Sequence, residues 1–200
     1  MLARRVVLKA KFLQRFTLSG RFLNTTQTHA EQIEKKEAER TDKLFKYVAP
    51  VYDHLNDAAY LGFHRNWRNK FIRQVAPSEN TKLIDVAGGT GAIPIRFLDY
   101  VKKNNIPHCH ITVCDINEDM LKMGKCKTVN YDSDLITWII ADGQSLPFDD
   151  ETFNAYTISF GLRCCSNLDK MLNEAYRILQ PGGKFFCLEF STLDNKIARW

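Results

Sequence analysis

The sequence lacks the features that mark several classes of protein. No stretch of about 18 apolar residues occurs, so the sequence predicts no membrane-spanning helix. The six cysteines include no C-x-x-C pair, and we find no internal repeat or low-complexity tract. No Gly-Lys-Ser or Gly-Lys-Thr is present, which excludes a P-loop. Its 44% hydrophobic content instead predicts a globular chain, and 200 residues suffice for one domain with a tail.

Acidic residues are missing from residues 1–29, where six basic residues alternate with Leu, Phe and Val. The rest of the chain holds 22 basic and 23 acidic residues, so it has no basic excess for nucleic acid and we expect no such partner. Arg-rich, acid-free and followed by hydroxyl-rich residues, segment 1–29 is typical of a mitochondrial transit peptide. An ordinary basic tail or surface helix is the alternative. The mitochondrial matrix is reducing, so we expect free thiols.

A metal site is not expected. His108, Cys109 and His110 place three donor side chains together, but in a polar turn without matching ligands elsewhere. The other cysteines lie mostly in apolar runs, where this residue usually packs as a small hydrophobe.

Short apolar runs alternate with amphipathic segments along the chain. This pattern predicts strands over 83–87, 111–115, 135–141, 155–160 and 184–190. It predicts helices over 31–46, from the glycine turn to about Lys103, and over 118–126 and 168–179, the last with a Ser166 and Asp169 capping box. The alternation favours the α/β class, with a mostly parallel sheet covered by helices on both faces.

A glycine turn follows the first strand. Gly88, Gly89 and Gly91 let backbone amides approach a ligand, and the next helix offers its N-terminus. A tight packing turn is the alternative. The dinucleotide fingerprint is not satisfied, because Pro94 occupies the position that requires a small residue.

Three acidic residues stand at the ends of successive strands. In such sheets ligands bind beyond the carboxyl ends of the strands, which places these side chains in one site. Asp115 suits the two ribose hydroxyls of a nucleoside, Asp142 with the Gly143 amide suits the adenine edge, and Asp85 suits an ammonium. Together they indicate S-adenosylmethionine.

Five blocks in order resemble the ubiquinone/menaquinone biosynthesis C-methyltransferases, over roughly Phe45 to Trp200. They are Tyr52-Asp53-His54-Leu55-Asn56-Asp57 with His64-Arg65-Asn66-Trp67, the turn Asp85 to Gly91, Ala141-Asp142-Gly143 with Leu146-Pro147-Phe148, Thr157 to Arg163, and Arg177 to Phe185 closing with Leu188-Glu189-Phe190-Ser191. The chain departs from the family at Leu55, Tyr60, Ala92, Pro94 and Cys164, where the family usually has Met, Ser, an acid, Ala and Asn.

This resemblance implies a class I, Rossmann-like methyltransferase fold whose cofactor is S-adenosylmethionine. The cofactor residues are then Asp85, Gly89, Thr90, Gly91, Asp115, Asp142, Gly143 and Ser159. It further implies three segments: the transit peptide 1–29, a helical lid and substrate segment over 30–80, and a cofactor-binding core over 81–200. The family fold continues with a helix and an antiparallel strand pair, which we expect to be missing after Trp200.

The implied reaction is C-methylation of a polyprenylated methoxy-benzoquinol, a step of ubiquinone biosynthesis. The ring carbon becomes nucleophilic when a phenolic proton is removed, so a base or a cation is needed beside the hydroxyl. Arg163 is the first candidate, as a cation that stabilises the phenolate. His64 is either a base or, with Tyr52, Asp53, Asn56 and Trp67, part of a helical lid over the cofactor. Tyr52, Asn56 and Trp67 are the candidate substrate-binding residues.

The resemblance also implies a matrix location, peripheral on the inner membrane, within a multi-subunit ubiquinone-biosynthesis assembly. A second copy of the chain is a further candidate partner. Two other hypotheses remain open: a catalytically inactive methyltransferase-like chain, and a methyltransferase for another small molecule.

Overall fold

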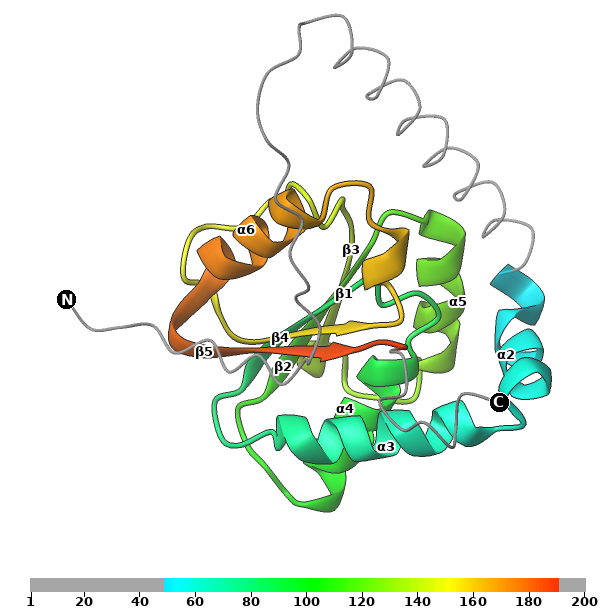
Figure 1. Cartoon of the computed structure of the whole chain (residues 1–200). Coiled ribbons are helices and arrows are strands. Elements are labelled where there is room, and N and C mark those ends of the chain that lie inside the picture. The colour runs from blue at the N-terminus through cyan, green and yellow to red at the C-terminus, as the bar shows by residue number, and fades with distance from the viewer. Residues whose placement is uncertain (1–48, 191–200) are drawn as a thin grey trace, which may run out of the picture.

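The computed structural model describes residues 49–190, so the predicted transit peptide and the helix predicted over 31–46 lie outside the described residues. The chain forms a five-stranded sheet in the order β3-β2-β1-β4-β5, and every neighbouring pair is parallel (Figure 1). The strands are β1 Lys82–Val86, β2 His110–Asp115, β3 Ile136–Ile140, β4 Phe153–Ser159 and β5 Leu179–Leu188.

Helices connect and cover these strands. The α-helices are α2 Tyr52–Tyr60, α3 Phe63–Val75, α4 Ala92–Lys103, α5 Glu118–Lys127 and α6 Leu168–Ile178, and the short 3-10 helices are η1 Ala49–Val51, η2 Ser133–Leu135 and η3 Leu162–Cys164. The structure therefore confirms the predicted α/β class with a parallel sheet.

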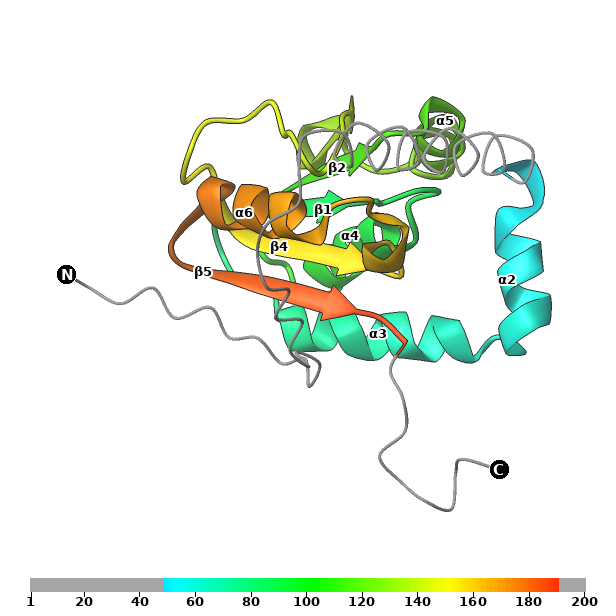
Figure 2. The ribbon, with the colours of Figure 1, turned by 45° about the horizontal axis from the view of Figure 1, so that its top comes forward.

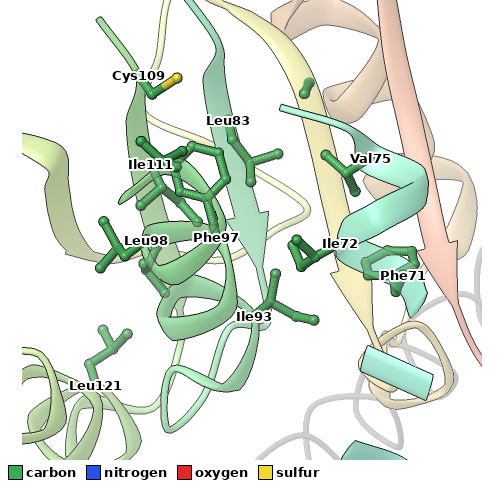
Figure 3. Close-up of a cluster of buried hydrophobic side chains, with 13 residues drawn as sticks. Phe71, Ile72, Val75, Leu83, Ile93, Phe97, Leu98, Cys109, Ile111 and Leu121 are labelled. Atoms are coloured by element: carbon green, nitrogen blue, oxygen red, sulfur yellow. The ribbon is translucent and has the colours of Figure 1, made fainter. Parts of the chain in front are cut away.

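Two apolar clusters separate the sheet from its helices. On one face, Phe71 and Ile72 of α3 pack with Phe97 of α4 and Leu83 of β1 (Figure 3). On the other face, Met171, Ala175 and Ile178 of α6 pack with Ile84, Val86 and Tyr156. Helices thus cover both faces, and α3 shares its core with the sheet, although it belongs to the segment predicted as a lid.

The predicted strands and helices within the described residues are confirmed, with shifts at their ends. Helix α6 ends at Ile178, because Leu179 already pairs with Phe153 as the first residue of β5. The next paired residue is Lys184, opposite Ala155, so residues 180–183 loop out at the predicted Pro-Gly-Gly turn, with Gly182 at φ +83°. The strand predicted from 184 therefore resumes an interrupted strand.

The predicted capping box of α6 is wrong. Asn167 is the N-cap, and its side-chain oxygen accepts a hydrogen bond from the Lys170 amide at 3.0 Å. The Ser166 hydroxyl instead donates to Gln144 Oε1 at 3.1 Å. Asn caps a helix as well as Ser does, and here Asn167 has the extended backbone that a cap requires.

Helices α2 and α3 form an elbow beyond the sheet. Figure 2 shows α2, in cyan, on the side toward which the arrowheads of β4 and β5 point. The turn between the helices uses positive φ at Leu61 and Gly62. Arg65 of α3 donates to Asp57 of α2, which fixes the angle of the elbow. None of the helices over 49–190 is long and apolar enough to cross a membrane.

Candidate functional site

The alternation of side chains along the strands places the predicted acidic residues on one face. Leu83 of β1 lies in the α3 and α4 cluster, so Asp85, two residues on, points to the same face. By the same period, Asp115 of β2 follows Val113 and Ser159 of β4 follows Ala155, both of that cluster. The carboxyl ends of three adjacent strands therefore present polar side chains toward α3 and α4.

The glycine turn lies across these strand ends. The Gly89 amide donates to Asp115 Oδ2 at 2.8 Å, and the Asn117 amide donates to Oδ1 at 2.9 Å. A Cβ on Gly88 would lie 2.4 Å from Val113 Cγ1, and Gly91 has φ +82°. Glycine is therefore required at both positions. Gly88 leaves no room for a side chain, and Gly91 needs a left-handed backbone.

Asp85 is the most deeply buried acidic residue of the site, with 1% of its surface exposed. Its Oδ1 accepts a hydrogen bond from the Thr157 hydroxyl at 2.7 Å, whereas the buried Oδ2 has no hydrogen-bond partner among the described residues. Burial raises the pKa of Asp85 to about 7, and the Asp115 carboxylate raises it as well, while the Thr157 bond and Arg68 act against the rise. A buried carboxylate oxygen without a donor is a costly feature that marks a place for a cationic donor.

Thr90 connects the glycine turn to helix α2. Its hydroxyl donates to Asp53 Oδ1 at 2.9 Å, and the Lys127 ammonium of α5 donates both to Asp53 and, at 3.2 Å, to the Thr90 carbonyl. The side chain of Thr90 is buried. A helix far away in the sequence is thereby tied to the turn that we expect to contact the cofactor.

Asp142 and Gly143 follow β3 in a tight turn. The Gln144 amide donates to Asp142 Oδ1 at 2.9 Å, so this carboxylate shapes its own loop. A Cβ on Gly143 would lie 2.7 Å from Val86 Cγ1 and 2.9 Å from Met171 Cε, which brings the backbone close to the sheet. Only a glycine permits that close approach.

His64 lies on the buried face of α3, with 4% of its surface exposed. Its Nε2 is 3.5 Å from Asp57 Oδ1, while its buried Nδ1 has no hydrogen-bond partner among the described residues. Burial and, next, the charge of Arg68 lower the pKa of His64, against the raising effect of Asp57. The imidazole is therefore neutral near pH 7. Its burial and the nearby charge of Arg68 both oppose protonation.

The other predicted lid residues separate into two groups. Tyr52 and Asn56 are half-buried on α2, and the amide nitrogen of Asn56 is buried without a hydrogen-bond partner among residues 49–190. Trp67 of α3 is instead part of an aromatic cluster, defined here as Tyr60, Trp67, Phe160 and Phe190, whose ring centroids are 4.8 to 6.4 Å apart in the contacting pairs.

Arg163 stands beside this aromatic cluster on η3. Its guanidinium carbon lies 5.1 Å from the Phe190 ring centroid and 5.9 Å from that of Phe160, and Nη1 donates to Glu189 Oε1 at 2.6 Å. Its side chain is 47% exposed. The structure therefore brings Arg163 and Trp67 to the same aromatic cluster, and it places His64 next to that cluster through Tyr60, at 6.0 Å between ring centroids.

A cavity of about 410 Å³ lies elsewhere, at the amino ends of β2 and β3. It is lined by the end of α4 and by the loops around Pro107 and Tyr131, and it contains none of the predicted site residues. Over residues 49–190, no group of three or more His, Cys, Asp or Glu side chains could hold a metal ion. The polar strand ends thus remain the candidate site.

Sequence reasoning did not single out Arg68, Lys127 or Glu189 as candidate site residues, although the structure places them beside the predicted ones. For Arg68 a signal was present, because residues 64, 68, 71, 72 and 75 recur at spacings of three and four along α3 and all are buried. An arginine on the apolar face of a helix is unusual and indicates a specific role. Lys127 had no such signal, since its contact with Asp53 spans 74 residues.

Solved structures with this fold define its class. A SAM-dependent methyltransferase from Aquifex aeolicus aligns at a TM-score of 0.53 and 18% identity, covering 64% of this chain and 67% of that one. The cyclase SpnF aligns at a TM-score of 0.54 and 22% identity, covering 64% of this chain and 48% of that one. With its 3-2-1-4-5 parallel sheet and glycine turn, the chain has the class I fold of SAM-dependent methyltransferases.

Sequence comparison places the chain more narrowly. The profile of the ubiE/COQ5 methyltransferase family matches residues 32–199, so the chain belongs to that family. Relatives named "2-methoxy-6-polyprenyl-1,4-benzoquinol methylase, mitochondrial" are 43% identical in Drosophila melanogaster, 38% in Gallus gallus and 36% in Homo sapiens, over 84%, 86% and 90% of this chain. The chain spans 59% of the Drosophila relative and 66% of the other two.

Proposed function

We propose that the chain binds S-adenosylmethionine and takes part in C-methylation of a 2-methoxy-6-polyprenyl-1,4-benzoquinol, a step of ubiquinone biosynthesis. The observation that carries the proposal is the set of unpartnered buried polar atoms at the carboxyl ends of β1 and β4, Asp85 Oδ2 and Ser159 Oγ. The names of the relatives supply the reaction, and they support it because these relatives share more than a third of their aligned residues with the chain.

The residues present fit the cofactor. Asp85 Oδ2 needs a cationic donor, and an α-ammonium group is one. At Gly88 a side chain would collide with Val113, so only glycine lets the turn pack this closely on the strand ends where we propose the nucleoside binds. We propose that Asp115 accepts the ribose hydroxyls, that Asp142 and the Gly143 amide meet the adenine edge, and that Gly89, Thr90, Gly91 and Ser159 complete the site.

The cofactor supplies, when bound, an electrophilic methyl group. The task of this chain is to make the ring carbon nucleophilic, and we propose that the Arg163 guanidinium stabilises the phenolate oxygen. Glu189 orients that guanidinium through the 2.6 Å hydrogen bond. The neutral His64 is the alternative proton acceptor, and Tyr52, Asn56 and Trp67 are the proposed substrate contacts. The aromatic cluster offers an apolar wall for the prenyl tail.

The proposal includes the location and organisation of the protein. We propose a mitochondrial matrix protein that lies peripherally on the inner membrane, in an assembly of ubiquinone-biosynthesis proteins or with a second copy of itself. The relatives named as mitochondrial support the compartment. The division into a transit peptide 1–29, a lid over 30–80 and a core over 81–200 is part of the same proposal.

The test is cofactor binding by isothermal titration calorimetry, followed by methyl transfer to a short-tailed demethylated quinol with the product identified by mass spectrometry. Asp115→Ala should weaken binding at least about tenfold, because it removes charge-assisted hydrogen bonds to the ribose. Glu118→Ala, which removes an exposed carboxylate nearby on α5, is the matched control and should bind like the unchanged chain.

Each result has a definite meaning. Binding with methylated product supports the whole proposal. Binding without transfer to any quinol favours an inactive, methyltransferase-like chain or another small-molecule substrate, and unchanged affinity in Asp115→Ala contradicts the role of that carboxylate.

A further inference from the structure

Helix α3 carries a buried arginine, Arg68, on the face that packs against the sheet. Arg68 lies one helical turn after His64 and one before Ile72, on the face that also buries Phe71 and Val75, and only 7% of its surface is exposed. Its guanidinium carbon lies over the Phe160 ring, 5.4 Å from the centroid. The charge of Arg68 is therefore held inside the molecule, at the residue that directly follows β4.

This position is next to Asp85. Thr157 pairs with Asp85 and Ile158 with Val86 across the parallel ladder, so Ser159 and Phe160 lie beside the end of β1. Asp85 and Ser159 both point toward the face covered by α3 and α4, where Arg68 is buried. Burial lowers the pKa of Arg68, against the raising effects of Tyr52, Asp53 and then Asp85, and the charge of Arg68 in turn lowers the pKa of Asp85.

Each of these two charged groups has one buried atom that lacks a hydrogen-bond partner among the described residues. Arg68 Nε and Asp85 Oδ2 are both buried without a hydrogen bond to any residue of the described part of the chain. Other arginines of the site region are engaged: Arg65 by Asp57, Arg163 by Glu189, and Arg96 by Asn69 and the Ala92 carbonyl. An unpaired buried cation is strongly unfavourable, so its retention points to a ligand that supplies the missing anion.

We propose that Arg68 binds the α-carboxylate of S-adenosylmethionine, while Asp85 binds the adjacent α-ammonium. The inference rests on the proposed cofactor and assigns a further residue to its site. A zwitterionic amino acid carries both charges on one carbon, which matches a buried cation beside a buried carboxylate. A quinol phenolate is the other anion that the proposed reaction brings, but it would add a negative charge next to Asp85 without pairing that carboxylate.

The test is a cycle of two ligands and two proteins, read by calorimetry. The ligands are S-adenosylmethionine and its decarboxylated analogue, which keeps the ammonium and sulfonium and lacks the carboxylate. The proteins are the full chain and Arg68→Met, which keeps the packing on Phe160 and loses the charge. Arg73→Met, an exposed arginine on the same helix, is the matched control, and Arg68→Lys restores the charge.

We expect Arg68→Met to weaken S-adenosylmethionine about 10- to 100-fold and to leave the affinity for the decarboxylated analogue unchanged, as a charge-assisted pair requires. Arg68→Lys should recover part of the loss, and Arg73→Met should match the unchanged chain. Equal losses for both ligands, or none for either, would overturn the role of Arg68. If the unchanged chain binds neither ligand, the proposed function itself fails, and thermal unfolding of Arg68→Met separates a binding defect from misfolding.

Discussion

At the scale of single residues, the candidate site holds charged groups of very different exposure, from the buried Asp85 to the exposed Arg163. Asp85 is the clearest case, because its folded pKa of about 7 lies well above the value near 3.9 of an unfolded chain. Desolvation is the main cause, and the charge of Asp115 adds to it. The carboxyl group is then protonated in the folded state at pH 5 and ionised in the unfolded state.

This difference predicts how stability depends on pH. A raised folded pKa contributes stability that is fully present below about pH 4 and is lost as the pH rises through about 7, because the folded state then binds more protons than the unfolded one. We expect the unchanged chain to lose free energy of unfolding relative to Asp85→Asn, which mimics the protonated form, between pH 5 and pH 8. Urea unfolding across that range measures the difference.

His64 and His110 also titrate differently in the folded and unfolded states, so their effect on stability has to be separated from that of Asp85. Burial lowers the pKa of each, which acts in the opposite direction, but both histidines are present in both proteins and cancel in the comparison. A difference in unfolding free energy that stays constant from pH 5 to pH 8 would show that Asp85 does not titrate in this window.

Arg163 is tested by separating binding from turnover. Because its guanidinium lies at the Phe160 and Phe190 rings and pairs with Glu189, whereas the cofactor contacts are proposed for other residues, Arg163→Ala should lower kcat for the quinol about 100-fold and change cofactor affinity little. Arg163→Lys should recover part of the rate. Turnover equal to that of the unchanged enzyme would remove Arg163 from the mechanism.

At the scale of elements, a glycine sets how closely helix α5 approaches the glycine turn. Trp138 of β3 lies against both Gly124 and Gly91, so one indole ring joins α5, β3 and the glycine turn. A Cβ on Gly124 would lie 2.3 Å from Trp138 Cη2 and 3.3 Å from the Thr90 carbonyl carbon. The helix can approach the turn this closely only without a side chain there.

Gly124→Ala should have two effects on the free energy of unfolding that are opposite in sign and similar in size. Alanine improves helix propensity by about 1 kcal/mol, whereas overpacking costs about 1–3 kcal/mol. We expect the packing effect to prevail, with a net loss of about 1 kcal/mol in urea unfolding, because one of the crowded atoms is backbone. Trp138→Phe should relieve that loss when combined with Gly124→Ala, and Cys126→Ala, exposed on the same helix, should change stability by less than about 0.5 kcal/mol. A stabilised Gly124→Ala would refute this account of the packing.

Helix α2 is also held by polar contacts from distant elements. Asp53 accepts from Thr90 and Lys127, which lie on the glycine turn and on α5. No residue of α2 is buried, so these contacts and the Asp57 to Arg65 pair replace a hydrophobic anchor. An element attached in this way can move more easily than α3, whose Phe71, Ile72 and Val75 lie in the core.

At the scale of the whole molecule, the parallel sheet gathers the site at one edge. The proposed cofactor site spans α3, β1, β2 and β4, so ligand binding should stabilise the native state as a unit. At a cofactor concentration 100 times the dissociation constant, the gain is about 2.7 kcal/mol, which corresponds to a rise in Tm of about 5–10 °C. Differential scanning calorimetry with and without S-adenosylmethionine measures it, with ATP as a control nucleotide that lacks the amino acid.

A rise in Tm of the same size with ATP would show that the site recognises only the nucleoside half. No rise with either ligand, at concentrations that saturate the family's cofactor site, would contradict the proposed cofactor.

The sequence by itself determined the order of strands and helices, the glycine turn and the acids at the strand ends. These features depend on local periods and on backbone freedom, which are written in consecutive residues. The resemblance of five blocks also sufficed to predict the family that the sequence comparison confirmed. The buried face of α3, with Arg68 among its apolar residues, has a matching spacing in the sequence but was recognised only in the structure.

Only the tertiary structure decided which of these residues meet. The strand order put Ser159 beside Asp85, the fold brought Lys127 to Asp53 across 74 residues, and the packing of α3 left Arg68 buried and unpaired next to that edge. It also showed Arg163 engaged by Glu189. Such contacts depend on crossovers and helix packing between distant segments, and no local period of the sequence encodes them.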